Sequence, residues 1–138
     1  MNLASAHLIT AMVTPFDDQQ HIDFHRLEQL IEHLLATGTD GLLVGGTTGE
    51  GPTLSIAEKR DLYTQTARIV AGRAPNIANT GTNDTAATIH FTHFVSLIEA
   101  IDASLVVVPP YYKPNLTGLF AHFTAIAGTS DLPILIYN

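Results

Sequence analysis

Short apolar runs alternate along the chain with longer segments in which apolar residues recur at helical spacing. The runs lack the polar alternation of a strand with one face in water, so they are typical of strands covered on both faces of a sheet. Five strands are expected, and they cover residues 8–13, 41–45, 76–80, 104–108 and 134–138.

The segments between these runs predict four helices. The first is expected to begin after the cap Asp23 and to end at Gly38. The second begins at Ser55, where Glu58 three positions later completes a capping box. The fourth covers residues 116–127. The third helix is marked by apolar side chains at Ile89, Phe91, Phe94, Leu97 and Ile98.

This alternation predicts an α/β fold in which helices cover a parallel sheet. The order of elements is (βα)4β, and the 138 residues amount to about half of a complete (β/α)8 TIM barrel, which needs roughly 250. We therefore expect one partial barrel domain over residues 1–138, truncated after the fifth strand. A doubly wound sheet fits the same alternation, and periodicity alone does not choose between the two.

Composition narrows the class of protein. The net charge is −7 with six Lys and Arg residues, and no basic run is present, which argues against binding to nucleic acid or to an anionic membrane. The absence of cysteine excludes disulfides and thiolate metal sites. No apolar stretch approaches the ~18 residues of a membrane span, and the N-terminus lacks the basic region of a signal peptide. We expect a soluble cytoplasmic protein.

Three strand ends carry candidate chemistry, because ligands of parallel α/β folds bind at the carboxyl ends of the strands. After the second strand, glycines would let the backbone of residues 45–50 approach a ligand, and Thr47 and Thr48 offer hydroxyl and N–H groups to a small carboxylate. Alternatively, these threonines only satisfy local backbone groups. Tyr111 and Tyr112 follow the fourth strand, where rim packing is the alternative. Tyr137 ends the fifth strand, where core packing is the alternative.

Taken together, these hydroxyls would form a proton relay at one edge of the sheet. Such a relay moves protons without adding fixed charge, which suits chemistry through imines and enamines. The relay residues include no electrophile or strong nucleophile that would start this chemistry.

Five segments in order resemble the dihydrodipicolinate synthase (4-hydroxy-tetrahydrodipicolinate synthase) family of pyruvate-dependent class I aldolases. They are Val13-Thr14-Pro15-Phe16, Gly46-Thr47-Thr48-Gly49-Glu50 continuing to Pro52-Thr53-Leu54-Ser55, Gly81-Thr82-Asn83, Pro110-Tyr111-Tyr112, and Tyr137-Asn138. The resemblance covers essentially the whole chain but only the N-terminal half of the family. It implies half of a (β/α)8 barrel that assembles as a homo-oligomer, a dimer of dimers, with no cofactor and no metal.

The resemblance also implies substrates and residue roles. Pyruvate would form a Schiff base with a lysine on the sixth strand and then condense with L-aspartate 4-semialdehyde, in lysine and diaminopimelate biosynthesis. Thr48 would bind the pyruvate carboxylate. Thr47, Tyr112 and Tyr137 would form the relay, with Tyr137 nearest the imine and Tyr112 reaching into a neighbouring subunit's site.

The chain departs from the family at several points. It ends before the Schiff-base lysine and before the arginine that binds the semialdehyde carboxylate, and its own lysines are Lys59 and Lys113. The tyrosine loop is one residue shorter than usual, which would displace Tyr112. The effector site of lysine-inhibited members would draw on Asn83 and Tyr111. The acidic residue expected one turn after Asn83 is Ala87, which argues against feedback inhibition by lysine.

Two other readings stay open. The chain is a half-barrel without catalysis of its own, either a remnant or a fragment that acts with another polypeptide, or it belongs to a sister pyruvate aldolase similar to the N-acetylneuraminate lyases. Lys113 lies in a rim loop, where solvation would keep it protonated and unsuited to imine formation. The pairs His21/His25 and His90/His93 have a spacing that a metal could use, but no third ligand accompanies them.

Overall fold

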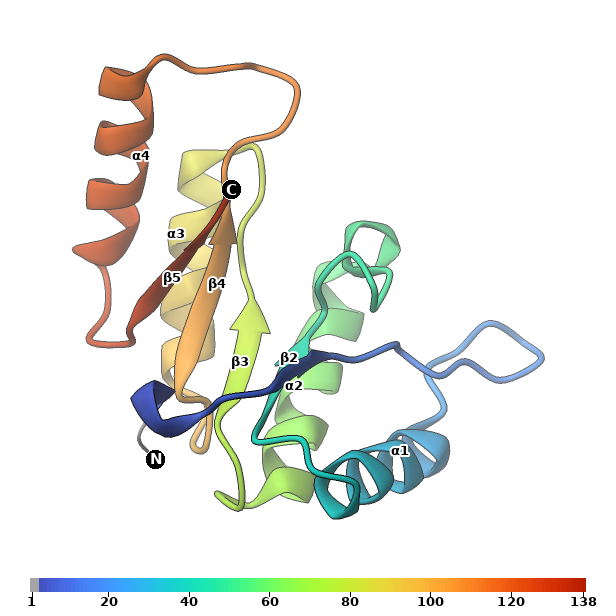
Figure 1. Cartoon of the computed structure of the whole chain (residues 1–138). Coiled ribbons are helices and arrows are strands. Elements are labelled where there is room, and N and C mark those ends of the chain that lie inside the picture. Colours follow the sequence, from blue (N-terminus) through green and yellow to red (C-terminus); the bar gives the residue numbers. More distant parts are fainter. Residues whose placement is uncertain (1–2) are drawn as a thin grey trace.

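The fold was taken from a computed structural model that describes residues 3–138. Met1 and Asn2, which belong to the expected domain and to the N-terminal segment considered above, lie outside the described residues. The elements follow one another as strand and helix along the chain (Figure 1). In chain order they are η1 (Leu3–Ser5), β1 (Ile9–Ala11), α1 (Phe24–Ala36), β2 (Gly41–Val44), η2 (Gly51–Thr53), α2 (Ile56–Val70), β3 (Asn76–Asn79), α3 (Thr85–Ser96), β4 (Ala103–Val107), α4 (Leu116–Ala127) and β5 (Ile134–Tyr137).

The strands pair in the order in which they occur in the chain. Within residues 3–138 they form one sheet, β1-β2-β3-β4-β5, and every pairing is parallel. A doubly wound sheet reverses its strand order at a switch point, whereas a barrel adds each strand beside the previous one. The order therefore confirms the predicted (βα)4β half of a (β/α)8 barrel and excludes the doubly wound alternative.

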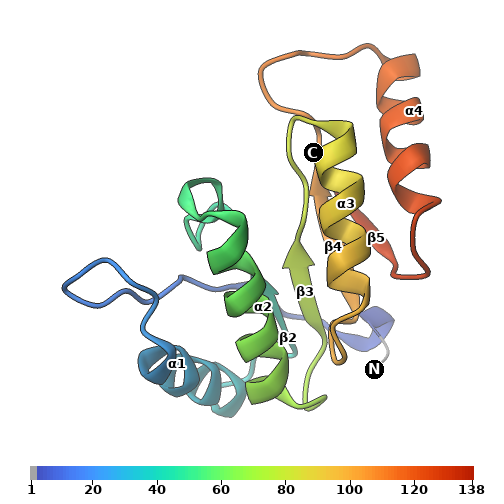
Figure 2. The same ribbon diagram turned by 180° about the vertical axis from the view of Figure 1, so that it is seen from behind.

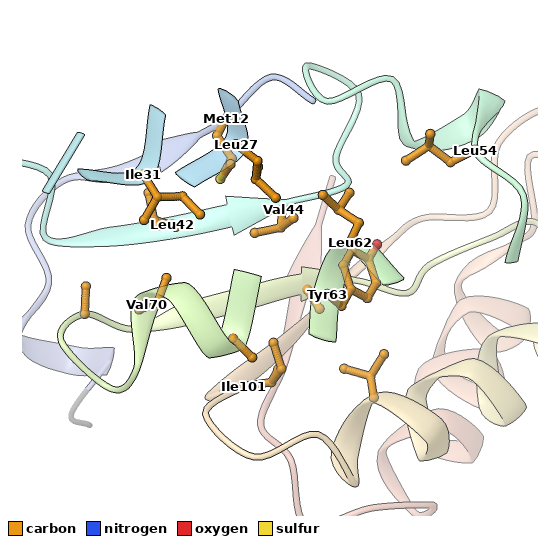
Figure 3. Close-up of a cluster of buried hydrophobic side chains, with 14 of the residues drawn as sticks. Met12, Leu27, Ile31, Leu42, Val44, Leu54, Leu62, Tyr63, Val70 and Ile101 are labelled. Carbon is orange, nitrogen blue, oxygen red and sulfur yellow. The ribbon is translucent and has the colours of Figure 1, made fainter. Parts of the chain in front are cut away.

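The helices lie on one side of the sheet. In Figure 1, α2 and α3 lie behind the strands, and in Figure 2, seen from the opposite side, they lie in front. Leu42 and Val44 of β2 are buried on this side, in one apolar cluster with Leu27 of α1 and Leu62 of α2 (Figure 3). Because side chains alternate along a strand, Leu43 faces the other side, which would be the interior of a closed barrel.

Capping explains why two helices begin where predicted. The Asp23 side chain accepts a hydrogen bond from the Arg26 N–H at 2.9 Å. At α2, the Ser55 N–H donates to a carboxylate oxygen of Glu58 at 2.7 Å, and the Glu58 N–H donates to Ser55 Oγ at 3.2 Å, which confirms the capping box. The helix α4 occupies the expected range Leu116–Ala127.

The end of α3 differs from the prediction, which placed Leu97 and Ile98 on the helix. That prediction is wrong, because α3 ends at Ser96 and Leu97 is the C-terminal cap. The N–H of Leu97 bonds to the carbonyls of Phe94 and Val95, which tightens the last turn and carries the chain out of the helix. Ile98 still packs against the core, whereas Leu97 is largely exposed.

The described sheet has two edges. Over residues 3–138, β1 pairs only with β2, and β5 pairs only with β4. β1 is shorter than the expected 8–13, although the N–H of Met12 still bonds to the Leu43 carbonyl at 3.1 Å. None of the helices formed by the described residues has the length and apolar character needed to cross a membrane.

Candidate functional site

A tight turn forms where β2 leaves the sheet. Gly45 has φ of +66°, in the left-handed region, and a Cβ there would come within 2.8 Å of the Tyr63 ring. The Gly46 carbonyl accepts hydrogen bonds from the N–H groups of Gly49 and Gly51, at 3.1 and 3.0 Å. Only glycine fits at Gly45, so the shape of the turn requires glycine at this position.

Side chains at the ends of β1 and β3, the strands on either side of β2, form hydrogen bonds to the first and last parts of this turn. On one side, Asn79 at the end of β3 donates from Nδ2 to the Gly45 carbonyl at 3.0 Å. On the other side, Thr14, which follows β1 and is buried, donates from Oγ1 to the Gly49 carbonyl at 2.7 Å. The turn is therefore fixed at Gly45 and Gly49, and no neighbouring side chain within residues 3–138 bonds to the residues between them.

Thr47 and Thr48 occupy the tip. Both are exposed, and within residues 3–138 neither their hydroxyls nor their backbone N–H groups donate a hydrogen bond. Adjacent free N–H and hydroxyl donors in a turn are a concave site for an anion. The alternative interpretation, in which these threonines satisfy the local backbone, does not describe their geometry.

The loop after β4 is held in a compact conformation between prolines. Tyr111 and Lys113 have φ of +72° and +45°, unusual for residues other than glycine, and the Tyr112 N–H bonds to the Pro110 carbonyl at 2.9 Å. The side chains of Tyr111 and Tyr112 are 90% and 70% exposed. The two phenols therefore project into solvent on this chain.

Tyr137 ends β5 on the side of the sheet away from the helices. Its carbonyl accepts from the Val108 N–H at 2.9 Å, and its side chain is 57% exposed, so within residues 3–138 it is not packed in the core. Thr47 and Tyr112 follow carboxyl ends of parallel strands and Tyr137 lies at one, so all three are at the carboxyl end of the sheet. Among the described residues no hydrogen bond joins their hydroxyls, and the relay stays a prediction.

The expected effector residues share the same edge. Asn83 is exposed in the turn between β3 and α3, just before Asp84, whose side chain caps the helix by accepting from the Ala87 N–H at 2.9 Å. Position 87, where lysine-inhibited members are expected to have an acidic residue, carries only the methyl group of Ala87. The role of Asn83 and Tyr111 stays a prediction.

The two lysines differ in environment. Lys113 is exposed in the tyrosine loop. Lys59 on α2 is largely buried, and this desolvation lowers the pKa of its ammonium group from the ordinary value of 10.5. Burial of Lys59 was not foreseen, because helical position alone does not tell which face packs.

The histidine pairs noted in the sequence form no metal site among the described residues. Across residues 3–138 no group of three or more His, Cys, Asp or Glu side chains is placed to hold a metal ion. His25 Nε2 lies 3.1 Å from the Gln29 amide nitrogen, and His21 Nδ1 lies 3.6 Å from an Asp17 carboxylate oxygen.

Sequence reasoning also missed Tyr63, Asn79 and the Thr14 contact, which hold the turn. The Asn79–Gly45 bond joins positions 34 residues apart, and the Tyr63–Asn79 bond joins positions 16 apart. The glycines at 45 and 49 signal a crowded turn, but nothing local in the sequence indicates which side chains crowd it.

The chain is similar to proteins of one known family over nearly its whole length. The family model described as the dihydrodipicolinate synthetase family matches residues 4–138. The 4-hydroxy-tetrahydrodipicolinate synthase of Limosilactobacillus fermentum is 59% identical over 136 residues, which are 99% of this chain and 44% of that protein. The chain thus spans slightly under half the length of this curated relative.

Solved structures agree in fold. The crystal structure of a dihydrodipicolinate synthase from Bacillus anthracis superposes with a TM-score of 0.94 at 44% identity, over 96% of this chain and 45% of that one. A dihydrodipicolinate synthase from Acinetobacter baumannii, solved in complex with pyruvate, gives 0.93 at 38% identity, again over 96% of this chain and 45% of the other.

Proposed function

The chain belongs to the dihydrodipicolinate synthetase family, and from this premise we propose that it forms the N-terminal part of an enzyme that condenses pyruvate with L-aspartate 4-semialdehyde. The product would be 4-hydroxy-tetrahydrodipicolinate, on the route to lysine and diaminopimelate. The family is a family of lyases. The activity, substrates and partners proposed for this chain rest on that membership and on the turn described above.

The unpaired donors of Thr47 and Thr48 carry the proposal. A carboxylate accepts several short hydrogen bonds, and bonds to a charged group are about twice as strong as neutral ones. Thr48 binds the pyruvate carboxylate through its hydroxyl and through N–H groups at the tip of the turn. The support is chemical, since these donors have no competing partner among residues 3–138, and pyruvate is the ligand of the A. baumannii relative.

Thr47, Tyr112 and Tyr137 move protons in this proposal. Tyr137 acts as acid and base nearest the imine, and Thr47 passes the proton to Tyr112. The 70% exposed side chain of Tyr112 supports a role in a site shared between two copies, because a phenol that reaches a neighbouring subunit must leave its own. Closure of the relay then requires a homo-oligomer.

The lysine that attacks the ketone of pyruvate comes from outside these residues. The chain corresponds to 44% of the L. fermentum relative, and its lysines are an exposed rim residue, Lys113, and a helix residue, Lys59. Lys113 is solvated and remains protonated near neutral pH, so it does not attack a ketone. Lys59 lies on α2, which covers the side of the sheet opposite to Tyr137. We assign carboxylate binding and proton transfer to this chain, and imine formation to a lysine on a sixth strand.

A second candidate function is a half-barrel that acts only with a partner polypeptide. The observation in its favour is an apolar groove between α4 and β5, lined in part by Leu116, Phe120 and Ile136, whose side chains are largely exposed. This surface lies beside the edge of the sheet at β5, where a further strand and helix would cover it.

Pyruvate titration of the 138-residue chain tests the first proposal. Addition of pyruvate should shift the amide resonances of Thr47 and Thr48 in 1H–15N spectra, and Thr48→Val should weaken binding about tenfold or more, the cost of one hydrogen bond to a charged group. Thr64→Val, on the exposed face of α2, is the matched control and should bind as the unmodified chain does. Equal affinity of the Thr48→Val and Thr64→Val variants would refute the assignment.

A further inference from the structure

The backbone leaves the β2–β3 pairing at Gly45, so the Gly45 carbonyl needs a hydrogen-bond donor from outside that pairing. The last ladder pair between β2 and β3 is Val44 with Ala78, and beyond it the Thr80 N–H bonds to Leu105 on the other side at 3.0 Å. The Gly45 carbonyl therefore has no backbone donor from β3. The Asn79 side chain supplies one, with Nδ2 at 3.0 Å.

Tyr63 contacts the end of β3 from the side of the sheet that the helices cover. Its side chain is fully buried on α2, with the ring centroid 5.7 Å from that of Phe91, and its hydroxyl donates to the Asn79 carbonyl at 2.5 Å. Figure 3 shows the Tyr63 ring beside the ends of β2 and β3. Burial raises the pKa of this phenol well above its ordinary value of 10, so the hydroxyl is protonated near neutral pH and can donate.

Two hydrogen bonds therefore connect α2 to the turn through β3. The first joins the Tyr63 hydroxyl to the Asn79 carbonyl, and the second joins the Asn79 side chain to the Gly45 carbonyl. Tyr63 and Gly45 are also closely packed, because a Cβ on Gly45 would lie within 2.9 Å of three Tyr63 atoms. The position of the turn relative to the sheet is consequently set by Tyr63 and Asn79. Neither side chain reaches the tip residues themselves.

We propose that Tyr63 and Asn79 are positioning residues that fix the Gly45–Glu50 turn so that Thr47 and Thr48 present a preformed carboxylate site. That the turn binds a carboxylate rests on the proposed function. That Tyr63 and Asn79 fix the turn is inferred from their hydrogen bonds and packing alone. Donors held in place before the ligand arrives bind it without an ordering cost, so their loss lowers affinity for a small anion.

The test compares Tyr63→Phe and Asn79→Ala with Thr92→Val. The control removes a buried hydroxyl of α3 that bonds to Thr80 Oγ1 at 2.7 Å, and so costs a similar hydrogen bond without touching the turn. The reporters are the amides of Gly49 and Gly51, which close the turn on the Gly46 carbonyl. Their hydrogen exchange should speed up about threefold to tenfold in both test variants, as expected for loss of one hydrogen bond, and match the unmodified chain in the control.

Pyruvate affinity, measured on the same samples, should fall by a similar about threefold to tenfold in Tyr63→Phe and Asn79→Ala, and should be unchanged in Thr92→Val. Exchange rates at Gly49 and Gly51 that match those of the control would overturn the positioning role. If the unmodified chain binds no pyruvate, the proposed function fails, and the exchange rates still decide the positioning role.

A third variant separates positioning from general loss of stability. Asn79→Asp keeps the size of the side chain, but its carboxylate cannot donate to the Gly45 carbonyl, whereas the protonated acid can. Relative to the unmodified chain, backbone motion of the turn should decrease as pH falls through the aspartate titration. Turn motion that does not depend on pH in this variant would contradict the assignment of Asn79 as the donor, and a variant of Tyr63 that fails to fold would leave this readout intact.

Discussion

His122 is a buried titratable residue that takes no part in the candidate site. It lies on α4 and contacts α3, where its Nδ1 is 2.8 Å from Thr85 Oγ1, and its ring meets Phe123 edge-on at 5.1 Å between centroids. Its Nε2 is buried and has no hydrogen-bond partner among residues 3–138. Desolvation lowers the pKa of His122 from its ordinary 6.5, because the charged ring would lose its hydration.

This shift predicts an acid-sensitive contact between α3 and α4. The folded pKa lies below the unfolded one, so the unfolded chain binds the proton more readily, and the contribution of His122 to folding is complete above pH 6.5 and is lost as pH falls below it. His122→Gln should flatten the dependence of the urea midpoint on pH between pH 7.5 and 5. A pH dependence unchanged by this substitution would show that His122 is not the titrating group, and His90→Gln, exposed on α3, is the control.

Single residues show how far the sequence predicted the site. The turn that carries Thr47 and Thr48 was predicted from the glycines around them, a local signal, and the binding role of these threonines stays a proposal. Tyr63 and Asn79 were not found, because their roles depend on contacts across 16 and 34 residues. Exposure likewise depends on tertiary packing, which explains why a core position was the default for Tyr137.

The helices and strands differ in how well their ends were predicted. Helix starts carry side-chain caps that are visible in the sequence, such as Asp23 and the pair Ser55–Glu58, and these bounds agree with the structure. Helix ends and strand ends are set by neighbours, so α3 stopped before Leu97 and β1 was shorter than its apolar run. Strand order was open for the same reason, since periodicity does not record which strands pair.

Strand β3 contains a buried polar residue without an evident role. The backbone of Asn76 bonds to Asp102 at both its N–H (2.9 Å) and its carbonyl (2.8 Å), but its side-chain amide has no hydrogen-bond partner among the described residues. A buried amide without partners costs about 1–3 kcal/mol, and valine favours strands. Asn76→Val should therefore stabilise the fold by about 1–2 kcal/mol in urea unfolding.

Asn115 is the matched comparison for this substitution. Its side chain caps α4 by accepting from the Gly118 N–H at 2.8 Å, so Asn115→Val should destabilise the fold by about 1 kcal/mol. Destabilisation by Asn76→Val would mean that the amide of Asn76 is satisfied in the folded protein, and the account of β3 would be wrong.

The molecule as a whole presents apolar surface at the β5 edge. Phe120 is 74% exposed on α4 and borders the groove next to β5, whereas Leu97 is exposed to nearly the same degree, 73%, at the end of α3. Unpaired strand edges and contiguous apolar patches promote association. We expect the 138-residue chain to self-associate with rising concentration.

Matched substitutions test where the chain associates. Phe120→Gln should shift sedimentation toward monomer by several-fold in dissociation constant, because it removes apolar area from the groove, and Leu97→Gln should leave association unchanged. Since both side chains are exposed, neither substitution should affect folding strongly. Equal effects of the two substitutions would exclude the α4–β5 groove as the contact.

The central claim is that this chain carries the carboxylate site but not the imine-forming lysine. The direct measurement is intact mass after treatment with pyruvate and borohydride, with the full-length L. fermentum relative treated in parallel. We predict that the relative gains the reduced pyruvyl adduct and that this chain gains none, although pyruvate shifts its Thr47 and Thr48 amides. An adduct on Lys59 or Lys113 would contradict the account, because the chain would then form the imine by itself.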